Sequence, residues 1–358
     1  MPLVPLYGHL ALRRRLAATV ARGALPGSLL IQGPRGIGKQ RLALWLGQYL
    51  LCTEHTGERP CGQCQSCRFA LALGHPDLRW FFPRPRLADG SAAHEQVLDD
   101  YAEALAGRAK SNGLYAAPSG MEGIFVATVR TIVTLAAYTP TLGARKVFIL
   151  GDAERMVPQE GADQAANAFL KLLEEPPADT TLILTSSEPG ALLPTIRSRV
   201  VTLRATSLPD ADVRAFLADP AVRSALEASD ASAPREDLVR RAAGRPGSLF
   251  GAAAHTAART AARALVDAAS ASRAEQMRVA MSFGGSRSRG FFSDVLDSVT
   301  VLLHERAQTA LRAGDEQDAM AAARAIDRVE HTKRRATGNV SPPLLSAALI
   351  HDLTEFLR

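Results

Sequence analysis

The chain has 358 residues, of which 47% are hydrophobic and 22% are charged. This composition excludes a disordered or fibrous chain and indicates a globular protein of two or three domains. A net charge of +6 is compatible with nucleic-acid contact, but the basic residues are spread over the whole chain. The N-terminus lacks the apolar segment of a signal peptide, and no apolar run is long enough to cross a membrane, so we expect a cytoplasmic protein without membrane partners.

The first predicted strand, SLLIQ at residues 28–32, leads into a glycine-rich segment, GPRGIGKQ, at residues 33–40. Apolar residues recur after this segment at helical spacing, so the local prediction is strand, loop and helix. That is the setting of a phosphate-binding loop with the pattern G-x-x-x-x-G-K-[ST]. Gly33, Gly38 and Lys39 fit the pattern.

The last position of this loop does not fit, because Gln40 stands where a Ser or Thr hydroxyl normally binds Mg²⁺. We expect Lys39 and the backbone N–H groups of residues 36–40, beginning at Gly36, to retain at most weak binding of ATP or ADP. Mg²⁺ binding should be weakened. Only five of the 42 basic residues are lysines, which favours a specific role for Lys39 beside phosphates.

All four cysteines fall within sixteen residues, at Cys52, Cys61, Cys64 and Cys67, with the spacing C-x8-C-x2-C-x2-C. Cytosolic thiols stay reduced, so disulfides are not expected. Four thiolates around one Zn²⁺ form a closed tetrahedral site with no open position for chemistry. The spacing therefore predicts a structural zinc site, with unligated buried cysteines or a redox pair as the alternatives.

Short apolar runs continue along the chain and alternate with helical patterns, which predicts a parallel sheet covered on both faces. The predicted strands after the loop lie at residues 75–82, 146–150, 181–187 and 200–204, and a helix is predicted at 165–175. The segment at residues 83–123 is rich in Pro, Gly, Ala and charge, with one helical patch near 97–105. We expect it to be a surface insertion that is partly ordered at best.

The run KVFIL at residues 146–150 delivers Asp152 to the sheet edge where a Walker B aspartate would hold Mg²⁺. An active ATPase of this type carries Glu next, whereas this chain has Ala153. Loss of a general base typically costs about 10²–10⁴ in rate. We expect Glu154 to point elsewhere, and the alternative for Asp152 is a simple helix cap.

After Pro209 the predicted structure is wholly helical. A small unit covers about residues 208–250, and an Ala-rich region continues from 251 to the C-terminus. Two apolar stripes in that region indicate either helix-bundle core or a subunit interface, which the sequence alone does not separate. The first stripe is Phe292, Val295, Leu296, Val299, Leu302 and Leu303, and the second is Leu344, Leu345, Ala348, Leu349 and Leu353.

Four segments together resemble the clamp-loader AAA+ subunits of bacterial DNA polymerase III. They are GPRGIGK, the cysteine module, AANAFLKLLEEPP at residues 165–177 and LLPTIRSRV at 192–200. The resemblance covers the first 250 residues well and the rest more loosely. It implies an α/β plus all-α architecture of three domains. These are an AAA+ P-loop domain at 1–207 with an inserted zinc module at about 52–67 and an insertion at about 83–123, a helical lid at 208–250 and a helical collar at 251–358.

The hydrolysing subunits of this family carry Ser or Thr after the loop lysine, Asp-Glu at Walker B and a sensor arginine in the lid. This sequence departs from them at Gln40 and Ala153, and residues 248–250 offer no arginine. The resemblance therefore implies a non-hydrolysing subunit of a DNA polymerase holoenzyme. Ser186 and Ser187 occupy the polar sensor-1 region and would at most report the state of the loop.

The family's S-R-C triplet is kept here as Ser198 and Arg199, with Val200 in place of Cys. The resemblance gives Arg199 the role of an arginine finger that stabilises the γ-phosphate of ATP on a neighbouring subunit. The alternative is an exposed arginine at the start of a strand.

As implied partners we expect other clamp-loader subunits, of the gamma/tau and delta types, in a hetero-oligomer, with primed DNA and the sliding clamp reached through the assembly. Two other functions remain open from the sequence. One is an active ATPase motor of the same loader, favoured by Lys39 and Asp152. The other is a DNA-binding module that uses the cysteine region and basic clusters, although few aromatic residues lie near the cysteines to stack on bases.

Overall fold

The structure is a computed structural model of the 358-residue chain. It describes residues 3–55, 57–87, 93–116, 122–156, 163–228, 233–250, 252–284, 288–336 and 340–357. By their contacts these residues form two compact units. The described part of the first ends at residue 250, and the second begins at Ala252.

The first unit is built on a five-stranded sheet with the order β2-β3-β4-β1-β5, and every pair of neighbouring strands is parallel. The five apolar runs predicted from the sequence all form strands, so the prediction of a parallel sheet is confirmed. The strands are β1 (Ser28–Gln32), β2 (Leu78–Phe81), β3 (Lys146–Leu150), β4 (Thr180–Ser186) and β5 (Val201–Arg204).

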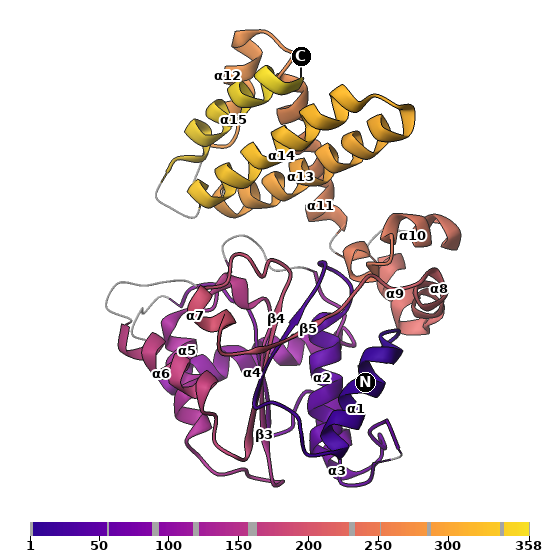
Figure 1. The fold of residues 1–358 in the computed structure, drawn as a ribbon, viewed down its shortest axis with the longest axis vertical. Coiled ribbons are helices and arrows are strands. Elements are labelled where there is room, and N and C mark those ends of the chain that lie inside the picture. The colour runs from indigo at the N-terminus through magenta and orange to yellow at the C-terminus, as the bar shows by residue number, and fades with distance from the viewer. Residues whose placement is uncertain are drawn as a thin grey trace. The chain divides into compact units, whose positions relative to one another are not determined.

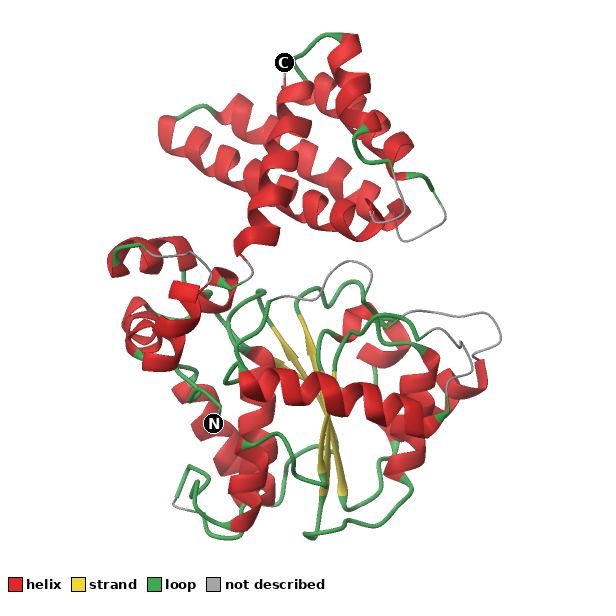
Figure 2. Ribbon diagram, turned by 180° about the vertical axis from the view of Figure 1, so that it is seen from behind, coloured by secondary structure: helices red, strands yellow, loops and turns green. Residues whose placement is uncertain are grey.

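Helices cover both faces of this sheet. In Figure 1, α1, α2 and α3 lie on one side of the strands, and α5 and α6 lie on the other. Figure 2 shows the same strands from behind, again flanked by helices. The helical segments of this part are α1 (Leu10–Ala21), α2 (Lys39–Leu51), α3 (Gln65–Leu71), α4 (His94–Lys110), α5 (Val126–Ala136), the 3-10 helix η1 (Ala153–Arg155), α6 (Asp163–Glu174) and α7 (Pro194–Arg197).

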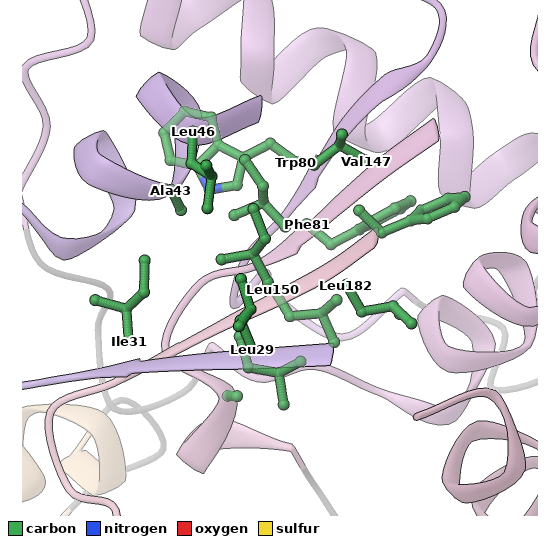
Figure 3. Packing of buried hydrophobic residues seen from close by; sticks show 14 of the residues in the cluster. Leu29, Ile31, Ala43, Leu46, Trp80, Phe81, Val147, Leu150 and Leu182 are labelled. Carbon is green, nitrogen blue, oxygen red and sulfur yellow. The ribbon is translucent and has the colours of Figure 1, made fainter. Parts of the chain in front are cut away.

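The central strands are continuous apolar runs because both faces of the sheet are buried. All five residues of β3 and all seven of β4 are buried. Successive side chains of a strand point to opposite faces. In β2, the Trp80 indole lies beside Leu46 of α2 (Figure 3), whereas Phe81 packs edge-on against Tyr101 of α4, with ring centroids 4.9 Å apart.

The expected surface insertion contains a helix that is packed into the core, which corrects the sequence-based expectation. Helix α4 is longer than the predicted patch, and its Val97 and Tyr101 side chains are buried. The Tyr101 hydroxyl donates to the Phe82 carbonyl at 2.6 Å, and Arg84 forms two hydrogen bonds with Asp100, of 2.7 and 2.8 Å. Residues 88–92 and 117–121 of the expected insertion lie outside the described residues.

A smaller helical group completes the first unit and has its own apolar cluster, which includes Val213, Leu217 and Val222. Val4 from the N-terminal segment joins this cluster, whereas the sheet and its helices form a separate one. The group consists of α8 (Asp210–Ala218), α9 (Pro220–Ala228), α10 (Arg235–Ala242) and the 3-10 helix η2 (Pro246–Leu249).

The second unit is all-helical and contains a third apolar cluster. The first predicted stripe lies in this core, with only Leu302 partly exposed. The second stripe is partly wrong, because Leu344 and Ala348 are exposed, and the buried face runs through Leu345, Leu349 and Leu353 instead. The helices are α11 (Ala252–Ala268), α12 (Arg273–Met281), α13 (Ser288–Ala313), α14 (Glu316–Ala336) and α15 (Pro342–Leu357).

Among the described residues, no helix combines the length and the apolar character needed to cross a bilayer.

Candidate functional site

The sheet order brings three polar segments together at its carboxyl edge. Strand β4 lies between β1 and β3, so the loop after β1, Asp152 after β3 and Ser187 after β4 are neighbours. In open parallel sheets, ligands bind at this edge. The candidate site is therefore the glycine-rich loop with the ends of β3 and β4.

Lys39, the first residue of α2, is buried and is held by the protein itself. Its Nζ donates to the Pro34 carbonyl at 3.0 Å and to Ser187 Oγ at 2.8 Å. Burial lowers the pKa of Lys39 to about 8, although the charges of Asp152 and Glu154 act against this shift. A phosphate anion bound beside Lys39 would stabilise its charged ammonium form and so offset the effect of burial. Lys39 therefore retains the chemistry of a phosphate-binding lysine.

Gln40 does not face an open metal site, because both ends of its amide are bonded to protein groups. Its Nε2 donates to Asp152 Oδ2 at 2.9 Å, and its Oε1 accepts from Trp80 Nε1 at 3.0 Å. The amide also packs on Gly151, where an added Cβ would lie 2.4 Å from Gln40 Oε1. Mg²⁺ requires near-octahedral oxygen ligands at about 2.0–2.1 Å. The residues present do not fit Mg²⁺, since an N–H donor is directed at the Asp152 carboxylate.

Asp152 adopts a left-handed backbone conformation (φ 49°), and its backbone N–H donates to Thr185 Oγ1 at 3.1 Å. Ala153 follows and is buried. The expectation that Glu154 points elsewhere is wrong. Its Oε1 accepts from the Ser187 backbone N–H at 2.9 Å, and its buried Oε2 has no hydrogen-bond partner among the described residues. Burial, followed by the charge of Asp152, raises the pKa of Glu154.

The loop backbone has the conformation that phosphate binding requires, but the small helical group packs against it. Gly36 and Gly38 have φ values of 83° and 88°, which favour glycine. The Gly36 carbonyl accepts from Gly247 N–H at 2.8 Å, and a Cβ on Gly36 would lie 2.9 Å from the Ser248 nitrogen. Gly33 is equally confined, because its Cβ would meet the Ala205 carbonyl oxygen at 2.2 Å.

The four cysteines converge on one point, as expected from their spacing. The Sγ atoms of Cys52, Cys61, Cys64 and Cys67 all lie within 4.8 Å of one another. Two of the S–S separations are 3.9 Å (Cys61 to Cys67) and 4.0 Å (Cys64 to Cys52). Tetrahedral Zn²⁺ with bonds of about 2.3 Å places its sulfur ligands about 3.8 Å apart. The donor set and its spacing therefore fit a metal such as zinc.

Backbone N–H groups also point at these sulfur atoms. Cys61 N donates to Cys52 Sγ at 3.3 Å, Cys64 N to Cys61 Sγ at 3.3 Å, and Cys67 N to Cys64 Sγ at 3.4 Å. Burial would raise the pKa of the Cys64 thiol, but the N–H donors of Cys67 and Thr53 outweigh it and lower this pKa to about 6. Such donors stabilise thiolates, which is the form that binds metal.

Arg199 lies away from the loop contacts, just after helix α7. Its Nε donates to Glu174 Oε2 at 2.9 Å, and its Nη1 donates to the Thr195 carbonyl at 3.0 Å. The Arg199 side chain is 31% exposed and that of Glu174 is 57% exposed. An ion pair this exposed is worth about 0–1 kcal/mol, so Glu174 by itself holds the guanidinium only weakly.

The structure thus joins Lys39, Gln40 and Asp152 at one edge, and the cysteines and Arg199 form separate places. Sequence reasoning missed Trp80 and Glu154 as parts of the loop site. Trp80 is one of only two tryptophans, which is a weak compositional signal. Glu154 has no local pattern that indicates its direction, and the 3-10 helix η1 turns its carboxylate back toward the end of β4.

Comparison with known proteins matches this chain to subunits of DNA polymerase III. A sequence model of the family described as DNA polymerase III, delta subunit, matches residues 8–209. The chain is 36% identical over 182 residues to DNA polymerase III subunit delta' of Pseudomonas aeruginosa, covering 51% of this chain and 43% of that protein. It is 31% identical over 185 residues to the same subunit of Escherichia coli, covering 52% and 44%.

A further match is DNA polymerase III subunit gamma/tau of Mycobacterium tuberculosis, with 30% identity over 229 residues, which cover 64% of this chain and 32% of that protein. The matched segments therefore span less than half the length of each of these relatives.

Proposed function

Because the chain belongs to the DNA polymerase III delta-subunit family, we propose that it is a delta prime type, non-hydrolysing subunit of a clamp loader. In this role it helps to load the sliding clamp onto primed DNA. It assembles with subunits of the gamma/tau and delta types and acts in the cytoplasm, at the replisome.

The observation that carries the non-hydrolysing role is the Gln40 amide between Trp80 and Asp152. Hydrolysis by P-loop ATPases needs Mg²⁺ at this place and a positioned water. Gln40 offers Asp152 an N–H instead of a hydroxyl that could share Mg²⁺. Ala153, which is buried, has no group that could polarise water. Nucleotide could still contact Lys39, but without the arrangement for its turnover.

Arg199 supports a second part of the proposal, in which this chain assists ATP hydrolysis on a neighbouring subunit. Its guanidinium is partly exposed and lightly held by Glu174, so it could move to a phosphate on a neighbouring subunit at little cost. An arginine finger supplied in this way is worth about 10³–10⁵ in rate for the site that receives it. The chain would then contribute to hydrolysis in the assembly without hydrolysing ATP.

The remaining parts have supporting roles in this proposal. We assign a P-loop domain to residues 1–207, a lid to 208–250 and an oligomerising collar to 251–358, an assignment supported by the presence of three separate apolar clusters. Zn²⁺ held by the four cysteines would tie α2 to α3, with all four ligand positions filled by thiolates. The metal supplies structure there and no catalysis.

The second candidate function is an ATPase motor of the same assembly. Two observations favour it: Lys39 is retained, and the chain matches a gamma/tau subunit over 229 residues. The Gln40–Asp152 hydrogen bond argues against it.

The test of the proposed function is ATP turnover by a clamp loader rebuilt with this chain carrying Arg199→Ala. Arg197→Ala is the matched control, because Arg197 is exposed at the end of α7, two residues before Arg199, and makes no side-chain hydrogen bond or ion pair among the described residues. We expect turnover to fall by about a thousandfold at the receiving site with Arg199→Ala and to stay unchanged with Arg197→Ala. Unchanged turnover in both would refute the arginine-finger role.

A further inference from the structure

Helix α4 inserts a charged side chain into a group of aromatic rings close to the loop site. The Arg108 guanidinium carbon lies 3.3 Å from the ring centre of Phe82, 3.8 Å from that of Tyr115 and 4.3 Å from that of Trp80. Trp80 and Phe82 are buried. The buried Nη1 of Arg108 has no hydrogen-bond partner among the described residues, so the rings hold this cation by their faces.

This aromatic group is directly continuous with the loop site through Trp80. One face of the indole receives Arg108, and its Nε1 donates to Gln40 Oε1, while Gln40 Nε2 donates to Asp152. Burial lowers the pKa of Arg108, and the charges of Tyr115 and Asp152 act against that shift. Arg108 is therefore linked to Asp152 through the Trp80 ring and the Gln40 amide.

Asp152 thus already accepts a hydrogen bond from Gln40, and the other end of that amide is held by Trp80, whose ring carries Arg108. A divalent cation placed here would have to displace the Gln40 amide and would be repelled by Arg108. The position of α4 is secured independently by the Arg84–Asp100 pair and by the Tyr101 hydroxyl.

We propose that Gln40, oriented by Trp80 and assisted by the positive charge of Arg108, occupies the divalent-cation position of the loop and makes it reject the Mg²⁺-complexed form of a nucleotide. Gln40 takes the ligand space, Trp80 fixes the orientation of its amide, and Arg108 adds a positive charge over the Trp80 ring. The helix α4 insertion acquires a role that its sequence did not suggest. This inference deepens the proposed function, and it concerns the isolated chain rather than the assembled loader.

The test uses Mn²⁺ as a paramagnetic substitute for Mg²⁺, with ADP in excess, and measures bound Mn²⁺ by electron paramagnetic resonance on the full chain. The variants are Gln40→Ser, Arg108→Met and the two combined. Methionine keeps an apolar side chain among the rings while removing the charge. Lys110→Met is the matched control, because Lys110 is exposed on the same helix and its loss removes one positive charge away from the rings.

We expect the double variant to bind Mn²⁺ with ADP at least tenfold more tightly than the unmodified chain, with each single variant in between and Lys110→Met unchanged. Trp80→Phe, which keeps a ring but removes the indole N–H, should also increase Mn²⁺ binding. Equal affinity in the unmodified chain and the double variant would overturn the proposal, whether both bind or neither binds.

Thermal unfolding of each variant shows whether it is folded. Trp80→Phe replaces any variant that does not fold. The Arg199→Ala result in the rebuilt loader does not depend on metal binding by this chain. A failure of this inference is therefore distinguishable from a failure of the proposed function.

Discussion

Replacing Gln40 by leucine tests the hydrogen-bond bridge on which the account of the loop depends. Leucine has a similar size but no polar atoms, so Gln40→Leu leaves the buried Trp80 N–H without its acceptor and Asp152 without its donor. A buried polar group left without a partner costs about 1–3 kcal/mol. Asp152 is only half-buried and can recruit water, so the cost of leaving its carboxylate without a donor lies at the lower end of that range.

The expected loss in the free energy of unfolding is therefore about 3 kcal/mol. For a unit of this size, each 1 kcal/mol shifts the melting temperature by about 2–4 °C, which gives a decrease of about 6–12 °C. Tryptophan fluorescence is the appropriate signal, because both tryptophans, Trp45 and Trp80, lie in the first unit. Gln65→Leu, at an exposed position of α3, is the matched control and should change the melting temperature by less than about 2 °C.

A Gln40→Leu variant that melted at the same temperature as Gln65→Leu, or at a higher one, would contradict this prediction. In that case the amide would be exchangeable for an apolar group, and the bridge could not hold Asp152.

Two further predictions concern metal content and pH. Purified protein should contain one Zn²⁺ per chain by metal analysis, and Cys64→Ser should lose the metal and lower the melting temperature of the first unit; much less than one Zn²⁺ in the unmodified protein would contradict the cysteine assignment. Burial raises the pKa of Glu154 above its ordinary value of 4.5, so the folded chain keeps this proton to a higher pH than the unfolded chain does. The stability contributed by the protonated form is present at low pH and is lost as the pH rises above about 4.5. Glu154→Gln, which keeps the acceptor for Ser187 N–H, should therefore melt at a higher temperature than the unmodified chain at pH 7, with the difference shrinking toward pH 4.5; a difference that grows toward low pH would contradict this assignment.

The strands and the cysteine cluster could be predicted because local patterns determine them. A strand buried on both faces must be apolar along its length, as KVFIL in β3 is, and cysteine spacing directly limits which thiols can meet. The exposed Leu344 shows where this reasoning fails, since an apolar stripe does not reveal which edge of a helix faces solvent.

The aromatic group around Arg108 could not be predicted, because it depends on contacts between distant segments. Trp80, Arg108 and Tyr115 come from a strand, a helix and a loop, and none of them belongs to a recognisable pattern. The same holds for Glu154, which reaches Ser187 across the ends of two neighbouring strands. The sequence shows the loop and its missing hydroxyl, and the structure shows that the Gln40 side chain bonds to Asp152 and Trp80.

ATP turnover by a rebuilt clamp loader, with Lys39→Ala in this chain alone, tests the central claim most directly. If the chain is a non-hydrolysing subunit, the assembly should turn over ATP within about twofold of the unmodified rate, because Lys39→Ala removes only contacts within this chain, to Pro34, Ser187 and any bound phosphate. A fall that removes one subunit's share of the turnover, in an assembly shown by gel filtration to be complete, would contradict the claim and identify this chain as a motor.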